Sequence, residues 1–139
     1  MLNIEPVYQR LDSDCGVACV QMILNWLEQN KRGIMGLGSV IDGLQVRTIE
    51  SFLREKGLRV ISGNFDIHML RHHVRQGAPV ICLVTDHYVL VKGFRPRKVI
   101  YNCPLNGEVE ESLAKFKKRW ATATDYTLVN WGVAAYADY

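Results

Sequence analysis

The chain has 139 residues, of which 48% are hydrophobic and 22% charged, the proportions of an ordinary globular protein. Its net charge of +3 is too small to indicate binding to nucleic acid or to a membrane surface. No stretch approaches the roughly 20 apolar residues that cross a bilayer, and the N-terminus lacks the pattern of a secretory signal. We therefore expect one cytoplasmic domain over residues 1–139, with no nucleic-acid partner and no membrane segment.

The first half of the chain is predicted to be mostly helical. Apolar residues recur at helical spacing from Cys15 to about Asn30, and the helix is apolar around so much of its circumference that it should be buried. Three candidate N-caps precede it, and three glycines mark an irregular loop after it. These residues are Asp12, Ser13 and Asp14, then Gly33, Gly36 and Gly38. The elements expected next are a helix over 46–56 stopped by Gly57, a strand over 58–61, and a helix over 67–76 capped by Asp66 and stopped by Gly77.

The second half is predicted to be mostly strands. Residues 79–85 are nearly all apolar, which indicates a central strand, and a very tight turn to 87–94 predicts antiparallel pairing. Further strands are expected over 98–103 and 126–131, with a helix over 108–120 between them. This order predicts the α+β class, with a helical N-terminal half packed on an antiparallel sheet.

Cys15 is the most informative residue because it begins a predicted helix. A thiol there meets the positive end of the helix dipole and unpaired N–H groups, which favour the reactive thiolate. Gly16 leaves room for a substrate, and the side-chain amide of Gln9 could stabilise an oxyanion at the same place. The other cysteines are Cys19, Cys82 and Cys103. With no CxxC spacing, we expect reduced thiols without a disulfide framework, and Cys19 and Cys82 as core residues.

His87 begins an apolar strand and is a plausible base for the thiol. A cysteine at a helix N-terminus opposite a strand histidine is the arrangement of papain-like cysteine hydrolases. Asn102 ends the next strand, where its amide oxygen could accept a hydrogen bond from the imidazole. Because adjacent side chains on a strand diverge, Cys103 should then point to the other face. The plainer interpretations are a structural histidine at a strand edge and an asparagine that only ends its strand.

Three other groups of residues have ordinary explanations. His68 and His72 have a spacing that can bind zinc, and His73 adjoins them, but no third ligand follows at a sensible distance. We therefore expect neither a metal nor a cofactor. Acidic residues at 108, 110 and 111 are interpreted as favourable charges at a helix start, and the basic run 115–119 as a solvated helix face.

Three motifs in order resemble the bacteriocin-processing (double-glycine) peptidases, a family of the papain-like cysteine peptidase superfamily. The motifs are Gln9 with Asp14-Cys15-Gly16, His87-Tyr88-Val89-Leu90-Val91, and Tyr101-Asn102-Cys103-Pro104 followed by Gly107. The resemblance covers almost the whole chain. It implies a cysteine peptidase that cleaves after small residues such as glycine, in leader-type peptides. It also implies that Cys15 is the nucleophile, and that the chain belongs to or associates with an export transporter or another larger assembly.

The chain departs from this family at one position. The family usually has Asp directly before the proline of the last motif, and this chain has Cys103 there. Either Asn102 orients His87 in its place, or the orienting role is lost. The residues therefore leave two functions open: a cysteine peptidase using Cys15, His87, Asn102 and Gln9, and a non-catalytic module of the same fold that binds a peptide or protein.

Overall fold

The computed structural model of the protein describes residues 1–9, 15–29, 46–85 and 87–137. Its helices are α1 (Cys15–Gln29), α2 (Val46–Glu55), α3 (Ile67–Arg75) and α4 (Leu113–Trp120). Its strands are β1 (Arg59–Asn64), β2 (Val80–Val84), β3 (His87–Arg95), β4 (Lys98–Cys103), β5 (Gly107–Ser112) and β6 (Trp131–Tyr136). None of the helices within these ranges is long and apolar enough to cross a membrane.

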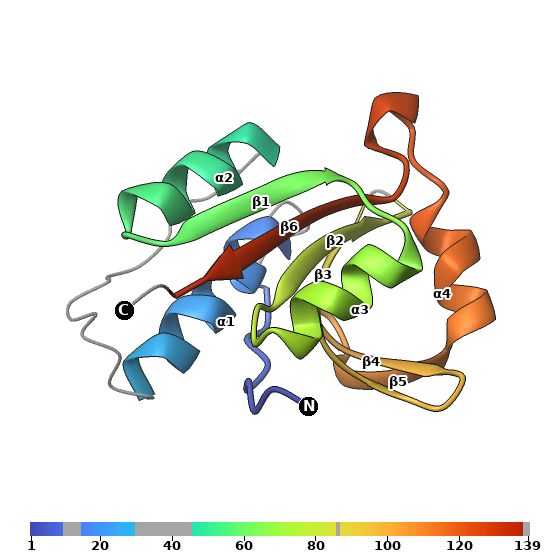
Figure 1. Cartoon of the computed structure of the whole chain (residues 1–139), viewed down its shortest axis with the longest axis horizontal. Coiled ribbons are helices and arrows are strands. Elements are labelled where there is room, and N and C mark those ends of the chain that lie inside the picture. Colours follow the sequence, from blue (N-terminus) through green and yellow to red (C-terminus); the bar gives the residue numbers. More distant parts are fainter. Residues whose placement is uncertain (10–14, 30–45, 86, 138–139) are drawn as a thin grey trace.

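The strands form one antiparallel sheet in the order β1-β6-β2-β3-β4-β5 (Figure 1). Every residue of β2 is buried, and β2 lies inside the sheet between β6 and β3. Both the central position of this strand and its antiparallel pairing with β3 were predicted, and both are confirmed. The α+β class is likewise confirmed.

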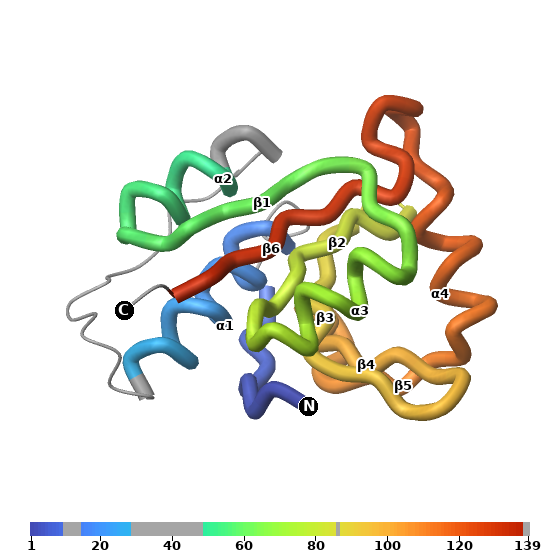
Figure 2. The backbone as a smooth tube through the Cα atoms, in the orientation of Figure 1, coloured from blue at the N-terminus to red at the C-terminus, as the bar shows by residue number. Residues whose placement is uncertain are grey.

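Helices cover both faces of the sheet (Figure 2). One buried cluster joins α1 and α2 to alternate sheet residues such as Ile81 and Leu90. A second cluster joins α3 and α4 to the opposite face, through residues such as Cys82 and Val89. We expected helices of the N-terminal half on the sheet, and the structure adds α4 from the C-terminal half. The two clusters explain why β2 and β3 are apolar on both faces.

The helix boundaries follow the predicted signals. Asp66 caps α3 by accepting a hydrogen bond from the Met69 amide at 2.8 Å. Gly57 and Gly77 follow α2 and α3 with positive φ of 87° and 89°, the left-handed conformation that ends helices. The N-cap candidates before α1 and the glycine-rich loop after it lie outside the described residues.

The predicted helix over 108–120 is wrong in its first part. Residues Gly107–Ser112 form strand β5, paired with β4, and α4 begins only at Leu113. Ser112 caps α4 by accepting a hydrogen bond from the Lys115 amide. The acidic residues at 108, 110 and 111 therefore lie on a strand and do not act at a helix start. Pairing with β4 overrides the local helix preference of the glutamates.

The predicted strand over 126–131 is also wrong. Tyr126–Leu128 is a short 3-10 helix, whose cap Asp125 accepts a hydrogen bond from the Thr127 amide. The last strand is β6, which begins at Trp131. Its glycine and alanines are poor strand formers, so sequence preference did not indicate it. Gly132 is required there because a Cβ atom would lie 2.5 Å from the Phe65 ring.

Candidate active site

Cys15 is the first residue of α1, and its side chain is buried with 8% exposure. Helix α1 packs against β3. Tyr88, the residue that follows His87, packs partly buried against the core cluster that contains α1. Burial first, and then the thiols of Cys15 and Cys19, raise the pKa of Tyr88 to about 12. The beginning of β3 therefore lies against the side of the sheet that α1 covers.

Cys19 and Cys82, the two thiols predicted to lie in the core, are more deeply buried than Cys15. Cys19 and Cys82 are fully buried, and burial raises the pKa of both thiols. Both therefore stay protonated at neutral pH, which confirms them as core residues and leaves no thiolate for chemistry. All four cysteines are free.

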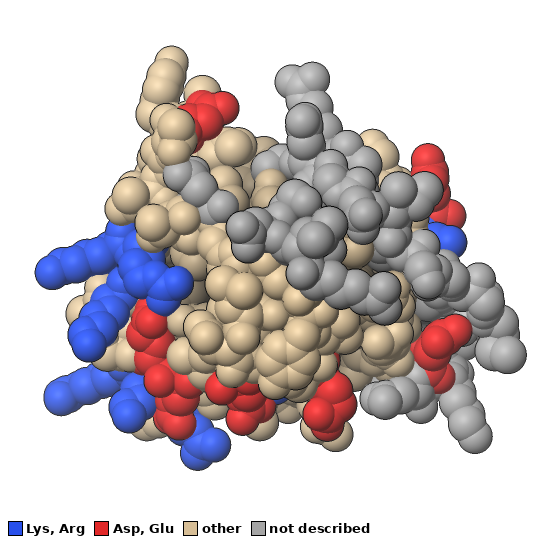
Figure 3. Space-filling view, turned by 180° about the vertical axis from the view of Figure 1, so that it is seen from behind, with Lys and Arg blue, Asp and Glu red and all other residues tan. Residues whose placement is uncertain are grey.

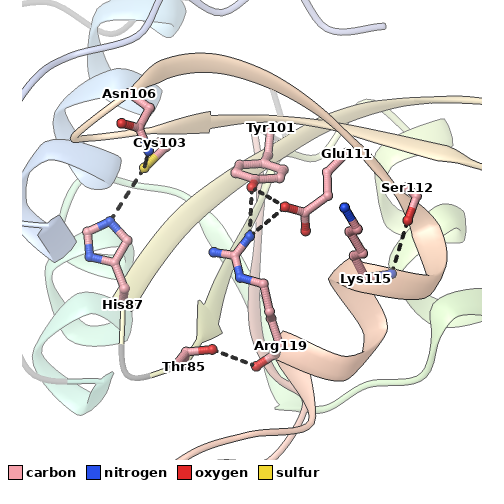
Figure 4. Close-up of polar contacts among 9 residues, drawn as sticks. All are labelled: Thr85, His87, Tyr101, Cys103, Asn106, Glu111, Ser112, Lys115 and Arg119. Carbon is pink, nitrogen blue, oxygen red and sulfur yellow. Dashed lines mark hydrogen bonds and ion pairs between the residues drawn. The ribbon is translucent and has the colours of Figure 1, made fainter.

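His87 is half-buried, and its Nε2 atom lies 3.6 Å from Sγ of Cys103 (Figure 4). Burial, and then the charge of Arg119, lower the pKa of His87 below 6.5. The Cys103 sulfur also accepts a hydrogen bond from Nδ2 of Asn106 at 3.6 Å. Since Nε2 faces Cys103, Nδ1 is the nitrogen left for a second partner.

The expectation for Asn102 is wrong. Its side chain is fully buried on the opposite face of β4, where Nδ2 donates to the carbonyl of Ile4 at 2.9 Å. Its Oδ1 atom has no hydrogen-bond partner among the described residues, so it does not orient His87. Adjacent side chains do diverge, as expected, but it is Cys103 that faces the imidazole.

A β-bulge in β3 explains this orientation. Near the hairpin, Gly93 pairs with Ile100, but Val91 then pairs with Tyr101, so Lys92 has no opposite residue. In an unbroken ladder Val91 would pair with Asn102. Because paired residues share a face, the bulge moves Asn102 away from the His87 face and brings Cys103 onto it.

Gln9 is half-buried and lies near the same end of β4. Its backbone N–H donates to the carbonyl of Pro104 at 3.0 Å, and Pro104 directly follows Cys103. The segment that carries Gln9 is thus bound to the turn beside Cys103. Gln9 and His87 therefore lie at the end of β4 that carries Cys103, and Cys15 begins the helix that packs on β3. The Asn102 side chain points away from His87.

A polar group that the sequence interpretation missed lies next to His87 (Figure 4). Nη1 of Arg119 donates to the Tyr101 hydroxyl at 2.9 Å and to Oε2 of Glu111 at 2.6 Å. The Tyr101 hydroxyl donates to the same carboxylate oxygen at 3.1 Å. The alternation of β5 could have indicated that Glu111 faces inward with Val109, had the strand been recognised.

The cluster of histidines at 68, 72 and 73 and the lysines of the basic run 115–119 are not part of the site around His87. His73 is buried and its Nδ1 atom bonds the Tyr136 hydroxyl, so it is part of the core. Within the described ranges no three His, Cys, Asp or Glu side chains are arranged to hold a metal ion. Lys117 and Lys118 are exposed on α4, and basic side chains gather along one side of the face in Figure 3, next to acidic ones.

Comparison with known families identifies the chain over most of its length. The sequence model of the Peptidase C39 family matches residues 3–129. No curated protein matches the chain.

Solved structures share the fold at low sequence identity. A double glycine motif protease from an AMS/PCAT transporter, solved in complex with the leader peptide, is 20% identical with a TM-score of 0.65, covering 96% of this chain and 98% of its own. The peptidase domain of Streptococcus ComA, a bi-functional ABC transporter involved in quorum sensing, is 17% identical with a TM-score of 0.71 and the same coverage. A C39-like peptidase structure from Bacillus anthracis is 14% identical with a TM-score of 0.72, covering 97% and 95%.

Proposed function

Because the chain belongs to the Peptidase C39 family of cysteine peptidases, we propose that it is an active peptidase with Cys15 as nucleophile and His87 as base. The observation that carries the proposal is that Cys15 begins the helix packed on β3, and that His87 is the first residue of this strand. The helix N-terminus favours the thiolate, and Nδ1 of His87 is the nitrogen left for the thiol proton.

The proposed reaction is acyl transfer in two steps. The Cys15 proton moves to His87, the sulfur attacks the peptide carbonyl carbon, and the carbonyl oxygen becomes an oxyanion near the Gln9 amide. The C–N bond then breaks and the amine leaves with the proton from His87. Water, deprotonated by His87, attacks the thioester, and the carboxylic acid product leaves as the C–S bond breaks.

We propose leader-type peptides with small residues such as glycine before the cut as substrates. The support is similarity to the double glycine motif protease whose structure holds a leader peptide. A narrow approach to Cys15, which is 8% exposed, would admit only small side chains. By the similarity to ComA, we also propose a cytoplasmic location and association with an export transporter.

Digestion of a peptide library containing Gly-Gly sites tests the activity. We expect cleavage after glycine by the natural protein and none by Cys15→Ala. Cys19→Ala is the matched control, because Cys19 is a core thiol one helical turn away, and it should keep cleavage within a few-fold. Cleavage that survives Cys15→Ala would contradict the assignment, as would iodoacetamide that modifies another cysteine before Cys15.

A non-catalytic module that binds a peptide is the second candidate. The observation that favours it is Cys103 against His87, because a thiol is a weaker acceptor than the carboxylate usual in the family. A module of this kind would bind Gly-Gly peptides equally well as the natural protein and as Cys15→Ala, without cleaving them. Its Cys15 would react with iodoacetamide at pH 5.5 no faster than an ordinary thiol.

A further inference from the structure

The N-terminal segment, residues 1–9, is bound to the sheet at two separate places. The Leu2 amide donates to the Lys92 carbonyl at 2.8 Å, and the Gln9 amide donates to the Pro104 carbonyl at 3.0 Å. Between them, the Ile4 side chain is 1% exposed in the core cluster that also contains α1. The segment therefore spans β3 and the end of β4 on the α1 side of the sheet.

The Ile4 carbonyl accepts hydrogen bonds from two buried side chains on neighbouring strands. Nζ of Lys92 donates at 3.0 Å and Nδ2 of Asn102 at 2.9 Å. The Lys92 side chain is only 4% exposed and forms an ion pair with Glu108 on β5. We call Ile4, Lys92, Asn102 and Glu108 the clasp.

Burying an ammonium group to bind one carbonyl is unfavourable in free energy. Removing it from water costs several kcal/mol, and apolar residues packed in the same space are often at least as stable. The polar arrangement instead fixes the register of the N-terminal segment along the sheet. Sliding the segment by one residue would turn the Ile4 carbonyl away from both side chains. The Asn102 amide would then lose its acceptor, and Lys92 would keep only Glu108.

Two glycines let the segment approach the sheet closely. A Cβ atom at Gly93 would lie 2.8 Å from Cγ of Met1, and one at Gly107 would lie 2.5 Å from the Tyr8 hydroxyl oxygen. Gly93 directly follows Lys92, the bulge residue. The same irregularity in β3 therefore turns Cys103 toward His87 and presents Lys92 to the N-terminal segment.

We propose that Lys92 and Asn102 are positioning residues, which hold Gln9 and Cys15 at the distance from His87 that the reaction requires. The roles of Gln9, Cys15 and His87 rest on the proposed function. The clasp holds Ile4, the segment leads to Gln9, and Gln9 is bound beside Cys103. Loss of the clasp lets this segment shift relative to the imidazole, and shifts of about 1 Å can cost roughly 100-fold in rate.

The test compares Lys92→Met and Asn102→Leu with Val74→Ala, a core variant on α3 in the opposite cluster. In each protein we measure kcat and KM for a cleaved peptide and the rate at which iodoacetamide modifies Cys15. We also measure hydrogen exchange of the backbone N–H of Gln9. We expect the clasp variants to lose about 10- to 100-fold in kcat with little change in KM. Cys15 should react several-fold more slowly, and the Gln9 amide should exchange at least about tenfold faster.

The control separates positioning from stability. Val74→Ala should lower the melting temperature but leave kcat, Cys15 reactivity and Gln9 exchange close to natural values. If the clasp variants change these quantities no more than Val74→Ala does, the proposal is overturned. Should Lys92→Met fail to fold, Asn102→Leu, which removes the other hydrogen bond to the Ile4 carbonyl, is judged alone by the same criteria. If the natural protein cleaves no peptide, the proposed function fails. Cys15 reactivity and exchange of the Gln9 backbone N–H then test by themselves whether the clasp positions these two residues.

Discussion

His73 and His87 are both histidines whose pKa is lowered chiefly by burial, but their neighbours differ. His73 lies in the core between Phe65 and Tyr136, and its Nδ1 atom shares a hydrogen bond with the Tyr136 hydroxyl. His87 is half-buried, and its Nε2 atom lies 3.6 Å from the thiol sulfur of Cys103.

The difference supports the proposal that His87, and not His73, exchanges protons with a substrate. An oxygen partner and aromatic packing hold His73 in one state inside the protein. A weak sulfur acceptor leaves His87 less strongly held, with one nitrogen turned toward no described partner. A lowered pKa alone therefore does not separate the two residues, because burial produces it in both, whereas the hydrogen-bond partner does.

Replacing each histidine in turn should separate their roles most clearly. His87→Ala should lower kcat/KM for a cleaved peptide by about 10⁴-fold or more, because the thiol loses its base. His73→Gln should change it by only a few-fold, since the amide can still bond Tyr136. Steady-state kinetics with both variants measures the contrast. Similar losses in both would show that the two histidines do not differ in role.

Gln9 belongs to the His87 region through its hydrogen bond to Pro104. If its side chain stabilises the oxyanion, Gln9→Ala should lower kcat by about 100-fold while the melting temperature hardly changes. Kinetics and thermal unfolding of the same preparation measure both quantities. A large loss of stability with unchanged kcat would instead make Gln9 a structural residue.

Cys103→Asp would give His87 an oxygen atom as hydrogen-bond partner, as Tyr136 gives one to His73. A carboxylate would stabilise the imidazolium and so favour the Cys15 thiolate, which should raise kcat/KM by about tenfold. The rate of Cys15 alkylation at pH 5.5, relative to pH 8.5, should rise with it. Cys103→Ser is the control, because a hydroxyl adds no charge. No gain from Cys103→Asp would favour the binding module.

We expect a smaller effect on how the free energy of unfolding depends on pH. His73 has a folded pKa below the ordinary 6.5, so the unfolded chain binds a proton that the folded chain does not. The free energy of unfolding should therefore fall as pH drops below about 6.5, and level off below the folded pKa. Urea unfolding at pH 7 and pH 5 should show a smaller fall for His73→Gln than for the natural protein. An equal fall in both would remove His73 from this dependence.

The sequence predicted correctly those helices whose formation depends on residues close to one another in the chain. Helix α1 follows its apolar spacing, and α3 begins at Asp66 and ends before Gly77 because caps and positive φ are local effects. Strands β5 and β6 were misplaced because pairing and packing decide them. Glutamates form β5 beside β4, and small residues form β6 beneath Phe65.

The amino-acid pattern alone was enough to predict that a thiol begins a buried helix and that an imidazole begins an apolar strand. It could not determine which of two adjacent residues, Asn102 or Cys103, faces that imidazole. A glycine inside a strand, such as Gly93, can mark a bulge, but it does not say which neighbour loses its partner. The skipped residue is Lys92, whose buried ammonium binds the distant Ile4 carbonyl. Only the tertiary structure brings Lys92 and Ile4 together, and a shift of one residue in register moves every later side chain of β4 to the other face.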